Sequence, residues 1–284
     1  MLKLTWICSG LTLALLSAAA LSAQNSEATI PPKEYVNPPA IRAVDTVFME
    51  DMTWLEIRNA MKAGKTTVIL PAGGLEATGP FVILDKHQRM LHGSTDIIAR
   101  KLGNALIAPV VRYVPPDDGN RGPYVGDFNI SLAAYKSTLS DICTALKNDG
   151  FKEILLIGDH QGAQRGLKEV AEELSQKWSG AARIHYIAEY YDRAAVQDYI
   201  KTKLGITEGR GGFGDNYYNT SILLAVSPED ARLQERTEAH QLTVNGVNLE
   251  PIQKTIENGK TILQIQTDQT VKAIQKAVAS DQGR

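Results

Sequence analysis

Two stretches of the sequence combine glycines with side chains that can bind a metal or move a proton. The first runs from Gly73 to His87 and contains Glu76, and the second runs from Gly158 to Gln164 and contains Asp159 and His160. Carboxylate and imidazole groups are the usual protein ligands of zinc and similar divalent cations. Taken alone, Glu76 could equally cap a helix or join an ion pair, and Asp159 and His160 could be structural. The residue types therefore permit a metal site without requiring one.

Each of these stretches follows a short apolar run that is predicted to be a β-strand. Strands are expected at 66–70, 105–111, 153–157 and 183–188, and helices at 53–63, 97–102, 131–148, 167–178, 220–226 and 264–278. Alternation of strands and helices indicates an α/β domain, and continuously apolar strands indicate a mainly parallel sheet covered on both faces. Ligands of such sheets bind beyond the carboxyl ends of the strands. We therefore expect Glu76 and His160 on neighbouring loops at one edge of the sheet.

Composition and charge restrict the class of protein. The chain has 284 residues, and 30 Lys and Arg stand against 32 Asp and Glu, which gives a net charge of −2. This balance argues against bulk binding of nucleic acid or anionic membranes, which usually requires an excess of basic residues. Hydrophobic residues make up 43% and charged residues 22%, as in ordinary globular proteins. The chain is long enough to bury a core without disulfides.

The beginning of the chain is typical of an export signal. Lys3 precedes an apolar run over 11–21, and the small residues Ser22 and Ala23 follow it. We predict a signal peptide over 1–23, an arm over 24–44 and one domain over 45–284, with a periplasmic or secreted protein that has no stable membrane insertion after cleavage. An uncleaved anchor is the alternative. Cleavage removes Cys8 and leaves Cys143, which is interpreted as a core residue of a helix rather than a nucleophile.

Several blocks in order along the chain resemble the creatininase (creatinine amidohydrolase) family. They are Met52–Arg58, Ala63–Pro71, Gly74–Glu76, Gly79–Pro80, Ala99–Pro109 and Gly150–His160. The resemblance implies a three-layer α/β/α sandwich with a mainly parallel sheet and metal-dependent hydrolysis of amides. It also implies a homo-oligomer, a hexamer in many members of the family.

The resemblance assigns a metal site residue by residue. The family's first Glu and its loop His fall on Glu76 and His160, and its bridging Asp falls on His87, which is still a competent ligand. Ligand positions of the family are lost at Thr78, Gly162, Gly214 and Asn219. Glu76, His87 and His160 therefore imply one divalent ion per chain, with Zn preferred and Mn as the alternative. Asp159 is expected to orient His160 or a neighbour.

Further polar residues are expected near the site. Gln164, Asp215 and Tyr217 are candidates for contact with a small planar substrate, although Asp215 could instead cap a helix and Tyr217 could pack on a surface. The main functional hypothesis is an amidohydrolase with Glu76 and Asp159 as catalytic residues. Because four ligand positions have changed, the alternatives are a catalytically degenerate binding protein or an oligomer with a vestigial site.

Overall fold

The computed structural model of the chain describes residues 42, 44–117, 125–180, 182–209 and 214–281. The chain divides into two units, Met1–Arg42 and Ala43–Arg284, and the following description concerns the second. The signal peptide expected over 1–23, and the arm expected over 24–44 apart from residues 42 and 44, lie outside the described residues. Both stay predictions.

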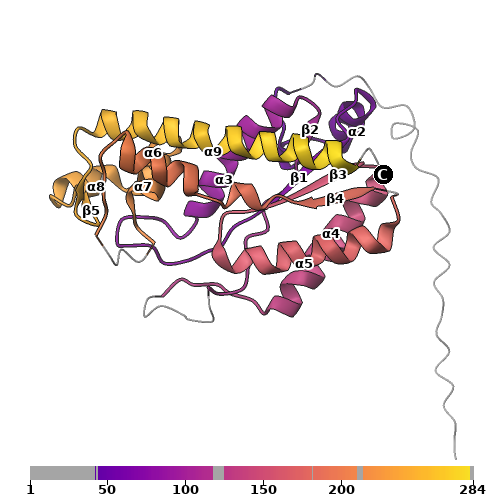
Figure 1. Ribbon diagram of the computed structural model, residues 1–284, viewed down its shortest axis with the longest axis horizontal. Helices are drawn as coiled ribbons and strands as arrows, with labels where there is room; N and C mark the ends of the chain where they lie inside the picture. Colours follow the sequence, from indigo (N-terminus) through magenta and orange to yellow (C-terminus); the bar gives the residue numbers. More distant parts are fainter. Residues whose placement is uncertain (1–41, 43, 118–124, 181, 210–213, 282–284) are drawn as a thin grey trace, which may run out of the picture. The chain divides into compact units, whose positions relative to one another are not determined.

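A four-stranded parallel sheet forms the centre of the second unit (Figure 1). Its strands are β1 (Thr67–Ala72), β2 (Ala105–Ile107), β3 (Glu153–Gly158) and β4 (Arg183–Tyr186), in the spatial order β2-β1-β3-β4. Strands β1 and β3 pair over their full lengths. Because all of these pairs are parallel, the carboxyl ends of the strands meet at one edge of the sheet. The predicted α/β fold with a mainly parallel sheet is confirmed.

Helices connect the strands and continue the chain beyond them. They are α2 (Trp54–Lys62), α3 (Lys86–Leu102), α4 (Leu132–Asp149), α5 (Gln161–Trp178), α6 (Ala194–Thr202), α7 (Tyr217–Val226), α8 (Leu233–Glu238) and α9 (Ile252–Asp281). Single 3-10 turns lie at η1 (Met49–Asp51), η2 (Ala188–Tyr190) and η3 (Pro228–Ala231), and β5 (Thr243–Val244) pairs with β6 (Val247–Asn248) in a hairpin. In Figure 1, α9 lies on one side of the sheet and α4 and α5 on the other. This is the expected three-layer α/β/α arrangement.

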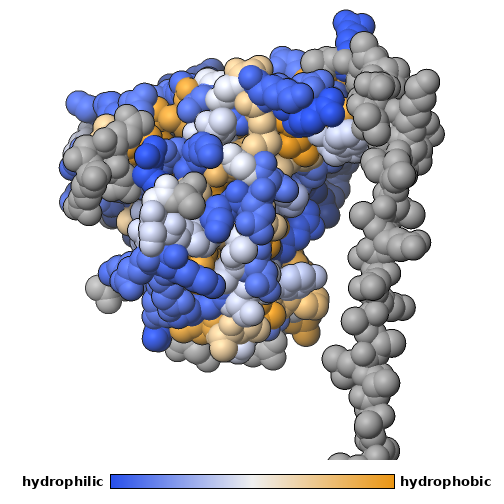
Figure 2. All heavy atoms as spheres, turned by 90° about the vertical axis from the view of Figure 1, so that its right-hand side faces the viewer, coloured by the Kyte–Doolittle hydropathy of each residue, from blue (hydrophilic) through white to orange (hydrophobic). Residues whose placement is uncertain are grey.

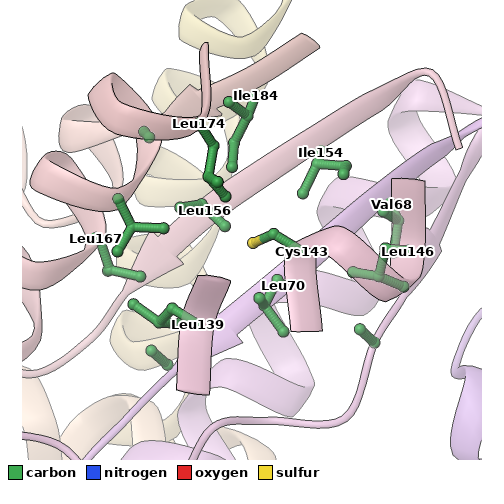
Figure 3. Packing of buried hydrophobic residues seen from close by; sticks show 14 of the residues in the cluster. Val68, Leu70, Leu139, Cys143, Leu146, Ile154, Leu156, Leu167, Leu174 and Ile184 are labelled. Atoms are coloured by element: carbon green, nitrogen blue, oxygen red, sulfur yellow. The ribbon is translucent and has the colours of Figure 1, made fainter. Parts of the chain in front are cut away.

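The alternation of side chains along the strands explains the two covered faces. Val68, Leu70 and Leu156 share a buried cluster with α4 and α5, and this packing is drawn in Figure 3. Ile69 and Leu155, the next residues along the strands, belong to a second cluster with α3 and α9. Successive side chains of a strand point to opposite faces, so a fully apolar strand requires cover on both sides.

Several helices and strands begin or end at other residues than predicted. The helix expected over 53–63 is confirmed as α2, with Thr53 and Glu56 forming a capping box. Strand β1 was expected to end before Pro71, but it continues to Ala72. Pro71 lacks only the N–H donor, and its carbonyl still accepts a hydrogen bond from the Val111 N–H at 2.9 Å. Helix α3 begins at Lys86, so His87 lies in the first turn of a helix rather than at the end of a loop.

Cys143 lies in the core between α4 and the sheet (Figure 3). Its side chain is fully buried, and burial raises the pKa of its thiol to about 12. The thiolate that reacts with alkylating reagents is therefore scarce at neutral pH. We expect native protein to resist iodoacetamide at pH 7.5 and denatured protein to take up one label at Cys143, as measured by mass spectrometry. Rapid labelling of the native protein would contradict this core position.

The surface of the second unit is mostly polar where Figure 2 shows it. Hydrophilic side chains cover most of that face, and hydrophobic ones form separate patches between them (Figure 2). Among the described helices, none has both the length and the apolar character that spanning a bilayer requires.

Candidate metal centre

Three potential metal ligands converge at the carboxyl edge of the sheet. Glu76 lies in the loop after β1, His87 in the first turn of α3, and His160 just after β3. The Glu76 Oε1 atom lies 2.9 Å from His87 Nε2, and the Glu76 Oε2 atom lies 2.9 Å from His160 Nε2. One ligand atom from each residue lies within 4.8 Å of those of the other two. The structure thus brings together the three residues that the sequence indicated as a metal set.

The Glu76 carboxylate remains ionised in this setting. Burial would raise its pKa, but hydrogen bonds from His160 and His87 and the positive charge of Lys86 outweigh burial and hold the pKa well below its usual range. A carboxylate that keeps its negative charge is a better ligand for a divalent cation. Two hydrogen bonds hold its loop in place, since the Ala77 N–H donates to Asp127 and the Glu76 N–H donates to the Leu84 carbonyl.

Asp159 fixes the orientation of His87 rather than that of its neighbour His160. The Asp159 side chain is fully buried, and its Oδ2 atom lies 2.8 Å from His87 Nδ1. A carboxylate behind a ligating imidazole fixes the ring and its tautomer, so that Nε2 is free to bind the cation. The other Asp159 oxygen lies 3.7 Å from Arg193 Nη2. Asp159 is therefore a positioning residue that acts through His87.

Replacing Asp159 with asparagine should weaken metal binding without removing a ligand. The amide keeps the shape of the carboxylate but loses its charge, and changes to such supporting groups typically cost about 10–100-fold in metal affinity. Zinc affinity measured by competition with a chromophoric chelator tests this expectation. Asp141→Asn, at an exposed position on α4, is the matched control. Equal affinities in the two variants would rule out the role of Asp159.

Two glycines give the site its shape. A Cβ atom at Gly74 would lie 2.5 Å from His160 Cδ2, so this position must stay small for the imidazole to reach Glu76. A Cβ atom at Gly162 would overlap the Pro115 carbonyl oxygen. This crowding explains why a ligand cannot stand at Gly162, where the resemblance to the family calls for one.

A lysine that the sequence patterns do not distinguish enters the site. The Lys86 side chain is 1% exposed, and its Nζ atom lies 2.5 Å from Glu76 Oε1 and 2.6 Å from Thr78 Oγ1. Asp117 also contacts the site, because its Oδ1 atom lies 3.2 Å from His160 Nδ1 and accepts a hydrogen bond from the Gly162 N–H at 2.8 Å.

The sequence gives a usable signal for Arg193 but none for Lys86. Arg193, which stacks over Tyr191 and Tyr218, follows β4 and could have been found from the rule that strand ends carry functional residues. No spacing rule distinguishes Lys86. It precedes His87 and resembles an ordinary charged residue in the first turn of a helix.

The three predicted substrate contacts each have a partner within the fold, and their contact with a substrate stays a prediction. Gln164 braces the His160 loop, because its Nε2 atom donates to the His160 carbonyl at 2.7 Å and its Oε1 atom accepts from Tyr186. Asp215 pairs with the buried guanidinium of Arg236 at 2.9 Å. Tyr217 is 2% exposed, and its hydroxyl lies 2.9 Å from Asn258 Nδ2 of α9. Tertiary packing thus engages Asp215 and Tyr217 inside the fold, whereas Gln164 also lines a cavity beside the site.

The donor set fits a divalent transition metal. One carboxylate and two imidazoles form a sufficient set for a catalytic zinc ion with an open position, and manganese accepts the same ligands. Two cavities border the loops that carry these donors. One of about 660 Å³ is lined by Pro116, Gly162 and Gln164, and the other of about 510 Å³ is lined by Ala77 and Thr78. The arrangement could therefore hold a cation beside space for a small molecule.

Comparison with known proteins gives a consistent relationship. The profile of the creatininase family, described as creatinine amidohydrolase, matches residues 50–274. A creatinine amidohydrolase of Pseudomonas putida is 23% identical over 201 residues, which cover 65% of this chain and 73% of that protein. A mutant creatininase of the Zn-Zn type superposes with a TM-score of 0.61 at 20% identity, covering 82% of this chain and 99% of the other. A structure designated creatininase Mn gives a TM-score of 0.62 at 20% identity, with coverages of 82% and 98%. The chain belongs to the creatininase family of metal-dependent amidohydrolases.

Proposed function

We propose that this protein hydrolyses the C–N bond of a small, non-peptide amide with one divalent cation per chain, held by Glu76, His87 and His160. The observation that carries the proposal is the convergence of these three ligand atoms within 4.8 Å. Zinc is preferred because one carboxylate and two imidazoles suit it, and manganese is the alternative.

The protein's own residues have separate tasks in this proposal. When bound, the cation supplies Lewis acidity for the amide carbonyl and for the attacking water. Glu76 stays ionised and either holds the cation or accepts a proton from water, and His160 completes the ligand set. Asp159 is fully buried, so it orients His87 and does not touch the substrate.

The choice of substrate to test first follows from the relatives. Creatinine, a small cyclic amide, is named in the description of the P. putida relative. The cavities of about 660 and 510 Å³ have room for a molecule of this size. Other cyclic amides belong in the same panel, because Thr78 and Gly162 differ from the ligand positions of the family.

A combined metal and activity measurement tests the proposal. Protein purified without chelator is analysed for metal by mass spectrometry and assayed with creatinine and other cyclic amides, with and without added Zn or Mn. We expect one equivalent of metal and metal-dependent hydrolysis of at least one amide. One equivalent of metal without any hydrolysis would favour a binding protein on the same scaffold, and no metal at all would reject the site.

We also propose that the protein is exported and assembles with copies of itself. The apolar start of the sequence and its small residues at 22 and 23 support export, with cleavage after Ala23 or Ala20. The resemblance to the family supports a hexamer, and exposed Val125 and Phe128 are apolar side chains that such an assembly could cover. The mass of the mature chain tests cleavage, and light scattering tests the oligomeric state. An intact segment 1–23 or a monomer would contradict these two expectations respectively.

A further inference from the structure

The ammonium group of Lys86 is one of the most deeply buried charges of the metal centre. It leaves the first turn of α3 directly beside His87, and its side chain is 1% exposed. An ammonium taken out of water is costly unless charged and polar partners surround it. Glu76 Oε1 at 2.5 Å and Thr78 Oγ1 at 2.6 Å are those partners. The position of Lys86 is thus built into the site.

Lys86 and the imidazole of His87 share one carboxylate oxygen. Glu76 Oε1 lies 2.5 Å from Lys86 Nζ and 2.9 Å from His87 Nε2, whereas Glu76 Oε2 faces His160. A metal ion bound to the two imidazoles and Glu76 therefore has a fixed positive charge beside it. Gly214 leaves room for Nζ because it has no side chain. A Cβ atom at this position would lie 3.2 Å from Nζ and 3.4 Å from Thr78 Oγ1.

We infer that the Lys86 ammonium occupies the place of a second metal ion, so that this centre combines one divalent cation with one organic cation. The inference rests on the proposed metal site. Both groups that hold Nζ, a carboxylate oxygen and a hydroxyl oxygen two residues away in sequence, are oxygen donors of the kind that hard cations prefer. A second divalent ion at this point would meet the ammonium at contact distance and be repelled. The relative of the Zn-Zn type has a pair of zinc ions by its designation, whereas here a side chain supplies the second positive charge.

Replacing Lys86 should change metal affinity in the opposite direction from that expected for a purely structural lysine. The ammonium competes with the metal for the negative charge of Glu76 and repels the metal directly. Removing this charge should strengthen metal binding, although it removes a hydrogen-bond donor and a buried contact. A lysine that merely supports the loop would weaken metal binding when it is replaced.

Zinc titration of four proteins tests this inference. Wild type, Lys86→Met, Lys86→Gln and the control Lys136→Met are titrated in competition with a chromophoric chelator, and bound zinc per chain is measured at saturation. Gln keeps a hydrogen-bond donor for Thr78 while removing the charge. The Gln variant therefore still tests the effect of charge if the Met variant fails to fold. Lys136 pairs with Glu169 and Glu173 away from the site, so its replacement removes the same charge elsewhere.

The expected results are specific to Lys86. Wild type should bind one zinc ion, and both Lys86 variants should bind zinc at least about tenfold more tightly, while Lys136→Met stays within about twofold of wild type. Zinc binding in the Lys86 variants alone would contradict the inference, because the wild-type centre would then hold the ammonium without a divalent cation. Two zinc ions in wild type, unchanged or weaker binding in the Lys86 variants, or no binding in any of the proteins would overturn it. Because none of these readouts uses hydrolysis, a failure of the proposed enzymatic function would be seen separately.

Discussion

Replacing His160 with alanine is expected to abolish stoichiometric metal binding and, with it, any hydrolysis. The imidazole contributes one of three converging ligand atoms, and its Nε2 atom lies 2.9 Å from Glu76 Oε2. Changes to groups that only support ligands cost about 10–100-fold in metal affinity, so loss of a ligand itself should cost more than about 100-fold. Metal analysis after dialysis and a zinc titration measure this effect.

The fold should largely survive this substitution. His160 is the N-cap of α5 and accepts a hydrogen bond from the Gly162 N–H at 3.1 Å, so its loss should lower the free energy of unfolding by about 1 kcal/mol. His92→Ala is the matched control, because His92 is exposed and stacks on Phe48 away from the three donors. A His160→Ala protein with one equivalent of zinc and wild-type affinity would show that the imidazole is not a ligand.

Replacing Glu76 with glutamine is expected to have an equally large effect by removing the central charge. The carboxylate is contacted by His87, His160 and Lys86, and its pKa is held low by these groups against the effect of burial. A neutral amide is a weaker ligand for a divalent cation and leaves the buried ammonium of Lys86 without its ionic partner. We expect loss of bound metal and of hydrolysis, together with destabilisation of about 3 kcal/mol.

The matched control for this change is Glu172→Gln on α5. Glu172 is 60% exposed and lies 4.0 Å from Lys168, a surface pair of small energetic effect. Chemical denaturation of both variants separates loss of stability from loss of metal. If Glu76→Gln kept wild-type zinc content and activity, Glu76 would be neither ligand nor base.

The sheet and the meeting of its loops could be predicted from the sequence for a physical reason. A strand such as Ile154–Ile157 is apolar at every position, which requires cover on both faces and hence a parallel sheet between helices. Once the strands are parallel, residues that follow them share one edge. This is why Glu76 and His160, 84 positions apart in sequence, lie within hydrogen-bond distance.

Tertiary contacts determine the partners of Asp215, Tyr217 and Asp159, which local sequence patterns could not predict. Asp215 and Tyr217 precede and begin a helix, and nothing local distinguishes a substrate contact from a partner inside the fold. The partners, Arg236 and Asn258, come from distant elements of the chain. Asp159 likewise contacts His87 across the sheet edge and not its sequence neighbour, because adjacent residues leaving a strand diverge to opposite sides.

The metal centre is tested most directly by X-ray diffraction from zinc-loaded crystals, with anomalous data collected on both sides of the zinc absorption edge. We expect a single anomalous peak per chain, at about 2.0–2.2 Å from a Glu76 carboxylate oxygen, His87 Nε2 and His160 Nε2. The Lys86 ammonium should lie beside that peak without binding it. Absence of a peak at this position, a pair of peaks, or a single peak bound by other residues would contradict the claim that Glu76, His87 and His160 hold one divalent cation.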